Sequence, residues 1–350
     1  MALDTFLVKA AELLLEPFRS WERLLSALSG IPHALTDFGS KTAWMYLLTS
    51  AVVACILYWV RKGRQLIEAD VSLRKFLCPP EIYRQRSAVV DYKYVAFDLT
   101  VRSLIYIPLM SGIAWLIYKS LHPLAVRVFT FDLPAMDPLT RGIVLTVATA
   151  AWADFGFFLS HYLMHRVSIL WIFHEIHHSA EVLTPVTVYR VHPVEDLVNA
   201  CVASILSAMS ASAYTATQGS DVKIIAIFGT NIVLFLFFVV AFQLRHSHIW
   251  LSYGPILEHI FISPAQHQIH HSTDPKHWNK NYGFVFATWD LLFGSLYVPR
   301  HRETIHYGVP GADPQDFSSV AKLYFLPFAK AARTLLKRPQ ASTPSVSIPR

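Results

Sequence analysis

The chain has 350 residues, of which 53% are hydrophobic and 15% are charged, and its formal net charge is +6. Its mean hydropathy of +0.37 exceeds what soluble proteins usually carry, which indicates a membrane protein. Its three cysteines exclude both a disulfide framework and a thiolate metal cluster. The lysines and arginines between residues 61 and 99 are typical of a cytoplasmic loop and not of a nucleic-acid-binding surface, so we expect no nucleic acid partner.

The N-terminal stretch, residues 1–28, has apolar side chains at helical spacing with charged residues interspersed. A signal peptide would have a charged head and an unbroken apolar core. We therefore predict an amphipathic helix that lies on the membrane surface, and we assign residues 1–40 to an N-terminal interfacial segment. A soluble helix packed on its own domain is the alternative.

Five later stretches are nearly free of charge and reach about the length that crosses a bilayer, roughly 17 to 25 residues. They are residues 43–60, 100–118, 141–160, 197–216 and 222–242. We predict an all-α, polytopic integral membrane protein with about four to five transmembrane helices and a cytoplasmic, histidine-rich helical cap. Two spans between residues 196 and 243 would place 161–192 and 246–271 on the same face of the membrane, and the basic loop makes that face cytoplasmic.

Histidines recur in these two regions at helical spacing. The rings of His161 and His165, four positions apart, would share one face of a helix. The sequences HEIHH and HQIHH repeat the spacing i, i+3, i+4 and contain His174, His177, His178, His267, His270 and His271. A lone histidine is more often a surface or hydrogen-bonded core residue, but eight clustered imidazoles would repel when protonated and leave polar atoms unpaired. The spacing therefore predicts two metal ions with about four ligands each, and two adjacent ions indicate catalysis.

An acidic residue, Asp154, lies seven positions before His161 inside an otherwise apolar span. Ionisable groups at such a depth generally have a function. We expect its carboxylate to accept the second ring proton of His161 or of a neighbouring ligand. A helix end close to the membrane interface is the alternative.

Residues 301–350 are predicted to form an interfacial helix followed by a disordered tail, which leaves 41–300 as the membrane-embedded catalytic domain.

Several motifs together resemble the fatty acid hydroxylase and sterol desaturase superfamily. They are DFGFFLSHYLMH, LWIFHEIHHS, VHPVED, SPAQHQIHHS and NYGFVFATWDLLFGSLY, which lie between about residues 141 and 298. The resemblance implies that the eight histidines named above are metal ligands and that His246 is a further ligand. For His192 and Glu195 it implies positions near the metal, with simple loop structure as the alternative, and for the Asn281–Tyr282 and Trp289–Asp290 pairs it implies structural support. His259 and His277 have no clear counterpart in the family, and we expect them at the surface. His248, where the family often has asparagine, could be a ligand, a supporting group or neither.

The resemblance further implies an oxygen-dependent oxidoreductase that holds two non-haem iron ions and uses dioxygen to hydroxylate or desaturate a lipid such as a sterol or fatty acyl chain. The lipid would enter from the bilayer, past Trp152, Phe155, Phe157 and Phe158 unless these only pack. Electrons would come from a cytochrome, ferredoxin or reductase, which the basic loop could attract. The short loops favour a bacterial inner membrane over the endoplasmic reticulum. A membrane metal transporter and a catalytically inactive metal-binding scaffold are the alternatives.

Overall fold

The computed structural model describes residue 12 and residues 15–36, 44–128, 136–218, 222–240 and 242–336. The longer helices are α2 (Trp21–Thr36), α3 (Trp44–Gly63), α6 (Arg86–Val101), α7 (Ile107–Val128), α8 (Pro138–Arg166), α9 (Ser168–His178), α10 (Pro193–Gln218) and α14 (Val320–Leu336). The shorter ones are α4 (Leu73–Leu77), α5 (Pro80–Tyr83), α11 (Ile232–Val240), α12 (Pro264–His270) and α13 (Thr288–Phe293). A π-helical stretch, Arg102–Tyr106, joins α6 to α7, and β1 (Ala226–Ile227) pairs antiparallel with β2 (Thr230–Asn231).

Short 3-10 helices complete the described chain. They are Glu16–Phe18, Pro185–Tyr189, Phe242–His246, Leu257–His259, Pro275–His277 and Pro314–Phe317.

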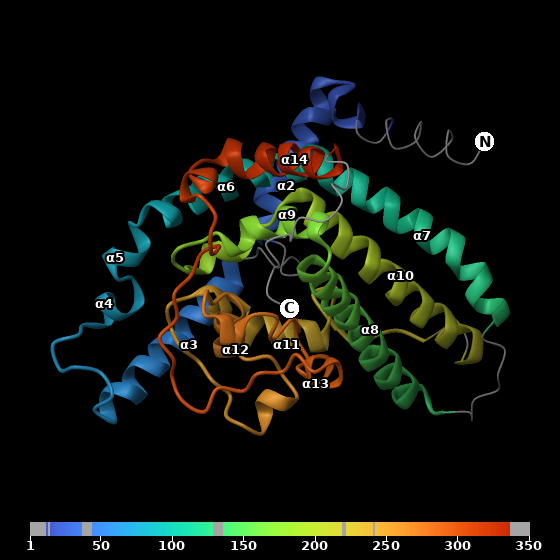
Figure 1. The fold of residues 1–350 in the computed structure, drawn as a ribbon. Coiled ribbons are helices and arrows are strands. Elements are labelled where there is room, and N and C mark those ends of the chain that lie inside the picture. The colour runs from blue at the N-terminus through green and yellow to red at the C-terminus, as the bar shows by residue number, and fades with distance from the viewer. Residues whose placement is uncertain are drawn as a thin grey trace, which may run out of the picture.

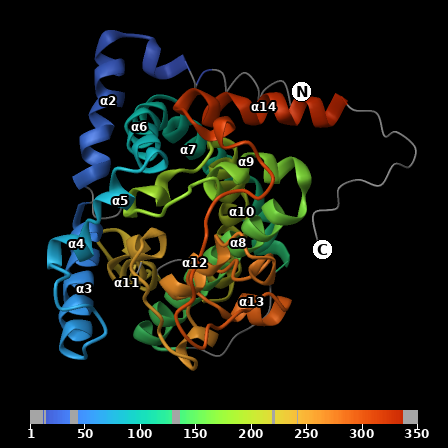
Figure 2. The same cartoon turned by 60° about the vertical axis from the view of Figure 1, so that its left-hand side comes forward.

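The helices are arranged around a centre that α9 and α12 occupy. Helix α10 packs between α7 and α8, whereas α3 lies on the other side of α12 (Figures 1 and 2). Helices α6 and α14 cover α9 from the outside, where Tyr94, Ile176 and Leu323 form a buried apolar cluster. The centre is therefore enclosed by helices from both halves of the chain.

Three of the described helices are long and apolar enough to cross a membrane. They are α3 with 20 residues, α8 with 29 and α10 with 26. The predicted class, a helical membrane protein, is confirmed, although the sequence led us to expect more spanning helices. The expected span 100–118 falls on the end of α6, the π-helical stretch and α7, which is not among the three.

The expected span 222–242 is wrong. Its first part folds back as the β1–β2 hairpin, which is fixed to α8 because the Ile225 amide donates to the Thr146 hydroxyl at 2.7 Å and Asn231 donates to the Thr146 carbonyl at 2.8 Å. Only 9 residues remain for α11. Nine residues rise about 14 Å, less than half of the roughly 30 Å of a bilayer core.

The histidine segments on either side of α10 nevertheless meet. The sequence argument needed two spans between residues 196 and 243 to bring them together, whereas the structure has one spanning candidate, α10, followed by the hairpin and α11. Helix α11 packs on α3 and α8 and returns the chain to the centre. A partial re-entry replaces the second crossing.

The two ends of the chain are described in part. Of the predicted N-terminal helix, residues 1–11, 13 and 14 lie outside the described residues, while Pro17 lies in a short 3-10 helix that α2 follows. Residues 337–350, where we expect a disordered tail, lie outside the described residues, and the three domain boundaries remain predictions. Before them, α14 packs on the catalytic region: the Lys330 ammonium lies 2.7 Å from the Glu175 carboxylate of α9.

Helices α8 and α10 approach each other most closely at a glycine. A Cβ atom added to Gly156 would lie 2.7 Å from the Cα atom of Ala203, which is backbone and cannot rotate away. We expect Gly156→Ala to separate the two helices locally and to lower the free energy of unfolding by about 1 to 3 kcal/mol.

Thermal unfolding in detergent measures this effect. Gly63→Ala is the matched control, because a Cβ atom at Gly63 meets nothing within 4 Å. Equal melting temperatures of the two variants would show that the helices tolerate the extra methyl group.

Candidate metal centre

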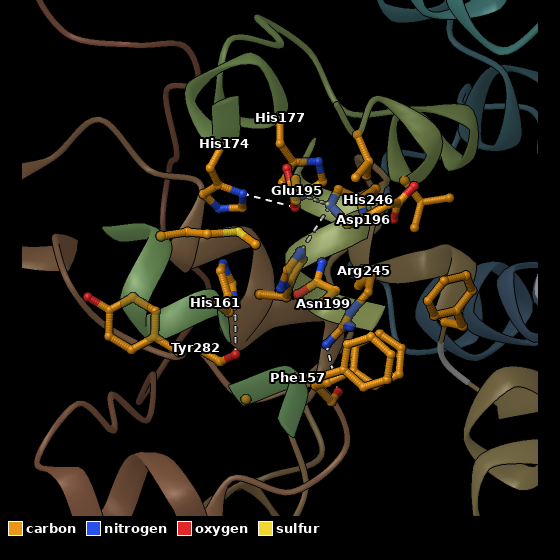
Figure 3. A pocket seen from close by; sticks show the side chains of 17 residues that line it. Phe157, His161, His174, His177, Glu195, Asp196, Asn199, Arg245, His246 and Tyr282 are labelled. Atoms are coloured by element: carbon orange, nitrogen blue, oxygen red, sulfur yellow. Dashed lines mark hydrogen bonds and ion pairs between the residues drawn. The ribbon is translucent and has the colours of Figure 1, made fainter. Parts of the chain in front are cut away.

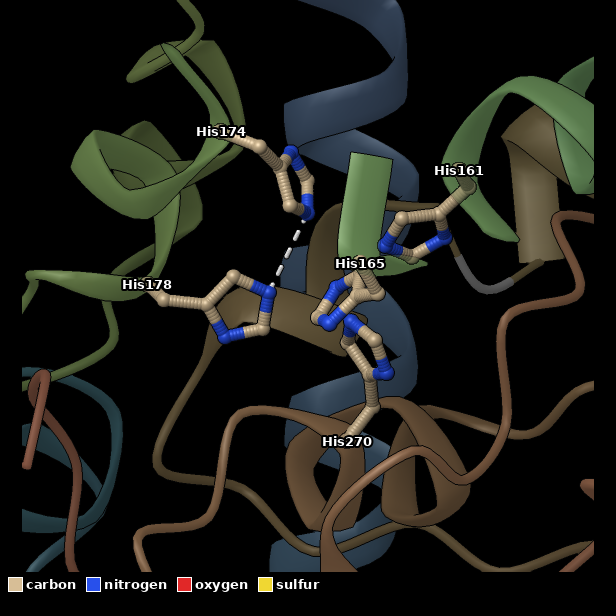
Figure 4. A group of neighbouring side chains, drawn as sticks. All are labelled: His161, His165, His174, His178 and His270. Carbon is tan, nitrogen blue, oxygen red and sulfur yellow. Dashed lines mark hydrogen bonds between the residues drawn. The ribbon is translucent and has the colours of Figure 1, made fainter. Parts of the chain in front are cut away.

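Nine histidines converge in two adjacent groups. The five-histidine site contains His161, His165, His174, His178 and His270, and the four-histidine site contains His177, His246, His267 and His271. In each group one ring nitrogen per residue lies within 4.8 Å of the others. Figure 4 shows the rings of the five-histidine site turned toward a common centre. These are the nine residues that the sequence analysis proposed as ligands, and the structure brings all of them together.

Consecutive histidines divide between the two sites. His177 and His270 each belong to a different site from the next residue in the chain, His178 and His271. Neighbouring side chains on a helix point about 100° apart, so one turn of α9 and one turn of α12 can serve two centres at once. The sites adjoin where the rings of His178 and His271 stack with centroids 4.5 Å apart.

Local sequence signals fix the helices that carry these residues. Helix α12 begins with a capping box, in which the Gln266 amide donates to the Ser263 hydroxyl at 3.1 Å and the Ser263 amide donates to the Gln266 side chain at 2.9 Å. Helices α8 and α9 meet at Val167, whose extended backbone ends one helix and begins the next. The rings of His165 and His174 therefore face each other across the bend, with centroids 4.9 Å apart.

Carbonyl oxygens fix the ring orientation of three ligands. The Nδ1 atoms of His161, His177 and His270 lie 2.8, 3.1 and 2.7 Å from the carbonyl oxygens of Tyr282, Arg190 and Lys280. Each Nδ1 must carry the proton in such a contact, which leaves the lone pair on Nε2. The Nδ1 atom of His174 lies 3.0 Å from Oε1 of Glu195, a carboxylate that attracts a proton on this nitrogen.

The Nε2 atoms lie at distances from one another that suit a bound cation. In the four-histidine site the Nε2 atom of His246 lies 3.1, 3.0 and 3.1 Å from the Nε2 atoms of His177, His267 and His271. Tetrahedral ligands about 2.0 to 2.1 Å from an ion lie roughly 3.3 Å apart, so this spacing fits a metal ion. In the five-histidine site the Nε2 atoms of His161, His165 and His270 are buried without a hydrogen-bond partner. The residues present therefore fit two metal ions.

Burial keeps the rings neutral at physiological pH. It lowers the pKa of His177 to about 3, and it lowers the pKa of His174, His178, His246, His267, His270 and His271 well below the ordinary value of 6.5. Protonated neighbours would repel one another, which acts in the same direction. The ligands are thus ready to bind a cation without first losing a proton.

The role expected for Asp154 is wrong. Its carboxylate accepts the amides of Val285 and Phe286 at 2.7 and 3.0 Å and the indole N–H of Trp289 at 2.9 Å. The Tyr282 carbonyl takes the place at His161 that we assigned to Asp154. Asp154 instead attaches the loop that follows Tyr282 to α8.

A second carboxylate shapes the other side of this loop. Asp290 accepts the amides of Tyr282 and Gly283 at 2.8 and 2.7 Å. Gly283 has no room for a side chain, because an added Cβ would lie 2.6 Å from the Phe286 carbonyl oxygen. The loop with the sequence NYG and the aspartate of the WD pair, Asp290, therefore hold the Tyr282 carbonyl oxygen beside His161.

His192 and His248 lie outside both sites. Nε2 of His192 lies 3.0 Å from the Tyr324 carbonyl oxygen, and its Nδ1 accepts the Val194 amide at 3.0 Å. His192 therefore caps α10 and contacts no ligand, contrary to the expectation of a position near the metal, whereas Glu195 contacts His174. The His248 ring donates to the Phe76 carbonyl at 2.8 Å.

The remaining two histidines differ from each other. His259 is exposed, as expected. His277 is buried, contrary to expectation, and its Nε2 atom lies 3.1 Å from the Glu303 carboxylate.

Sequence reasoning missed a buried ion pair that supports the four-histidine site. The Arg190 guanidinium lies 3.0 Å from the Asp91 carboxylate of α6, and both side chains are almost fully buried. The pair fixes the backbone of Arg190, whose carbonyl oxygen orients His177. Asp91, an aspartate among apolar residues of α6, could have indicated a buried ion pair, but the sequence does not identify the residue that pairs with it.

A cavity of about 100 Å³ reaches both sites (Figure 3). His161 and His174 of the five-histidine site line it, together with three members of the other site. Apolar side chains form much of its wall, and the polar ones are Glu195, Asp196, Asn199 and Arg245. Of the aromatic residues considered for a lipid route, only Phe157 lines this cavity, while Phe155 and Phe158 pack against the ring of Phe293.

Comparison with known proteins finds a family model that matches the part of the chain that carries this centre. Residues 146–295 match the fatty acid hydroxylase family model, and this range includes all nine converging histidines. The chain is 28% identical to ornithine lipid hydroxylase OlsE of Rhizobium tropici over 86% of this chain and 85% of that protein.

Two further relatives match less than half of this chain. Alkylglycerol monooxygenase of Homo sapiens is 26% identical over 45% of this chain and 31% of that protein. Delta(7)-sterol 5(6)-desaturase erg3C of Aspergillus fumigatus is 25% identical over 45% of this chain and 49% of that protein. The chain thus spans less than half the length of these two relatives. No solved structure matches it significantly.

The buried imidazoles make the metal-free protein sensitive to acid. Between pH 6.5 and about 3 the unfolded chain binds a proton at His177 that the folded chain does not, and the other buried ligands act in the same direction. The stabilising effect of these neutral rings is complete above pH 6.5 and is lost as the pH falls toward the folded pKa.

We expect metal-stripped protein to melt at a lower temperature at pH of about 5.5 than at about 7.5. Removing the exposed ring by His259→Ala should leave this difference unchanged. The same melting temperature at both pH values would mean that the rings are not buried as neutral groups.

Proposed function

This chain belongs to the fatty acid hydroxylase and sterol desaturase superfamily, and we propose that it holds two iron ions at the nine converging histidines. It is a membrane enzyme, an oxygen-dependent oxidoreductase that modifies a lipid. The observation that carries the di-iron proposal is the division of each HH pair between two sites, because a single ion would leave about half of the buried imidazoles without a ligand role.

Iron is the metal that the family favours for this donor set. Imidazole alone also suits zinc, copper and nickel. A structural zinc ion would need only about four ligands, often including cysteine, and it would not account for a second site. Bound at these positions, the two irons would supply the reductive activation of dioxygen.

The residues of the chain prepare this chemistry in three ways. Carbonyl oxygens accept the Nδ1 protons of three ligands and the Glu195 carboxylate attracts that of His174, so that Nε2 faces the metal. Seven of the nine rings are buried, which keeps bulk water away from the reacting atoms. The cavity brings a substrate against ligands of both sites, so that a C–H bond can be positioned beside them.

The substrate we propose is a lipid with a polar headgroup. The relative that covers most of both chains is named as an ornithine lipid hydroxylase. The cavity supports this choice, because Asn199 and the buried guanidinium of Arg245 line it beside the metal ligands. Each already has one partner in the protein, the Phe284 carbonyl for Arg245 and the Ser160 hydroxyl for Asn199, and a polar headgroup would bind their remaining hydrogen-bonding atoms.

The alternatives explain less. A metal transporter should line a path through the bilayer with polar groups, whereas the nine histidines form one centre. An inactive scaffold gains no support from the relatives, which are enzymes. We further propose that the centre faces the cytoplasm and that the membrane is a bacterial inner membrane.

Metal content tests the di-iron proposal. Protein purified in detergent should contain about two irons per chain, because each site offers a full set of ligands. The double variant His177→Ala, His270→Ala removes one ligand from each site and should lose most of the iron together with oxygen-dependent lipid turnover. His259→Ala is the control, because this ring is exposed and lies in neither site. Iron that persists in the double variant would contradict the assignment.

The electron donor should dock beside the five-histidine site. Arg84 and Arg86 are exposed and flank Gln85, whose side chain donates to Glu181 at 2.7 Å, three residues after His178. We propose that these arginines attract an acidic cytochrome, ferredoxin or reductase.

We expect the pair of changes Arg84→Glu, Arg86→Glu to slow reduction by an acidic ferredoxin at low ionic strength by about tenfold or more, and added salt to reduce the difference from wild type. Arg333→Glu on α14 is the matched control. Reduction at the wild-type rate in the double variant would place the donor elsewhere.

A further inference from the structure

An apolar patch lies outside the helices that are long enough to span a membrane. Its members come from the segment around the 3-10 helix Leu257–His259 and from α13. They are Ile256, Leu257, Ile260, Phe261, Leu291, Leu292 and Phe293. Ile256 is 79% exposed and Leu292 is 73% exposed, although both are large aliphatic residues. Exposed apolar groups gathered in one place mark an interaction surface.

The patch presents no charge. The only acidic residues within 254–262 and 286–294 are Glu258 and Asp290, and these ranges contain no lysine or arginine. Both carboxylates are fully buried and turned inward, where Glu258 accepts the Ser263 hydroxyl and Asp290 accepts the Tyr282 amide. The exposed surface is therefore apolar, apart from the ring of His259.

The two segments of the patch form one unit. The Ala287 amide donates to the Ile260 carbonyl at 2.8 Å, and the Ile262 amide donates to the Val285 carbonyl at 2.9 Å. The rings of Phe261 and Phe286 lie with centroids 5.8 Å apart. The exposed side chains are thus held on a fixed backbone.

The unit is attached to a spanning helix. Asp154 of α8 accepts the amides of Val285 and Phe286, and the ring of Phe293 lies 5.0 Å from that of Phe158 of α8. Helix α13 lies beside α8 in both views (Figures 1 and 2). Helix α8 itself exposes Val147 and Trp152, so the apolar surface of the helix continues onto the patch.

The length of α8 gives the depth of the patch. Its 29 residues extend about 44 Å, whereas a bilayer core is roughly 30 Å thick. Phe155 lies about 26 Å from the first residue of the helix, near the far boundary of that core, and its ring is 4.9 Å from the ring of Trp289 in α13. With the start of α8 taken as one boundary of the hydrocarbon core, the patch lies near the other boundary, where hydrocarbon meets the headgroups.

We propose that this apolar patch inserts into the bilayer interface beside α8. The occupant is lipid, because the patch continues the exposed apolar face of a spanning helix and carries no charge for a protein partner to recognise. The histidine-rich segment after α11 would then be a membrane-embedded element and not part of a cap that stands clear of the bilayer. The inference rests on the spanning role of α8 and is independent of the proposed di-iron chemistry.

Nitroxide labels on full-length protein in phospholipid vesicles test the proposal. Cys55, Cys78 and Cys201 are first replaced by serine, and single cysteines are then introduced by Ile256→Cys and Leu292→Cys. Val147→Cys on α8 is the lipid-facing control, and Lys276→Cys is the water-facing control. Collisions with dissolved oxygen and with a water-soluble nickel complex are compared at each position.

We expect labels at positions 256 and 292 to collide with oxygen more than with nickel, as at position 147 and opposite to position 276. Nickel accessibility equal to that at position 276 would overturn the proposal. Protection from both reagents together with spin–spin broadening would also overturn it, in favour of contact between two copies of the chain. Neither outcome depends on metal content or turnover, so failure here leaves the proposed function to its own test.

Discussion

The constraint on which the rest of the structure depends is the convergence of nine imidazoles, seven of them buried, whose Nε2 atoms face one another. Lone pairs about 3 Å apart repel unless a cation lies between them. The fold meets this condition by holding the opposite nitrogen of several rings with carbonyl oxygens or a carboxylate. Several surrounding polar residues position the carbonyl oxygens that make these contacts. Asp154 and Asp290 shape the loop at Tyr282, and Asp91 fixes Arg190.

The convergence of eight histidines could be predicted from the sequence because it depends on helical periodicity, whereas His246 was indicated only by the family resemblance. Spacings of three and four residues place rings on one side of a helix whatever the helix packs against. The partners of the other ring nitrogen could not be predicted in this way. Tyr282 lies 121 residues after His161, and it contributes a carbonyl oxygen that any residue type carries. Asp154 was recognised as unusual, but its partners are backbone amides, which leave no signal in the sequence.

Hydropathy predicted the membrane class and the helices α3, α8 and α10, but it could not distinguish a crossing from a return. Residues 222–242 are apolar throughout most of their length, yet Asn231 and Thr146 tie the first part to α8. Hydropathy is equally uninformative about the segment after α11. Every stretch of this segment that is long enough to span a bilayer contains a charged residue. Glu258 and Asp290 nevertheless point inward, so the exposed surface around them is apolar.

The origin of the ligands along the chain has a consequence for biogenesis. Both sites need histidines of α12, and α12 is joined to later residues through Asn281, which donates to the Gln266 carbonyl and accepts the Tyr297 amide. Because a chain is synthesised from its N-terminus, neither site can be assembled until the stretch up to Tyr297 has been translated. Any metal ion at these sites would therefore be bound only after α12 has been made, and a product truncated before α12 lacks histidines of both sites.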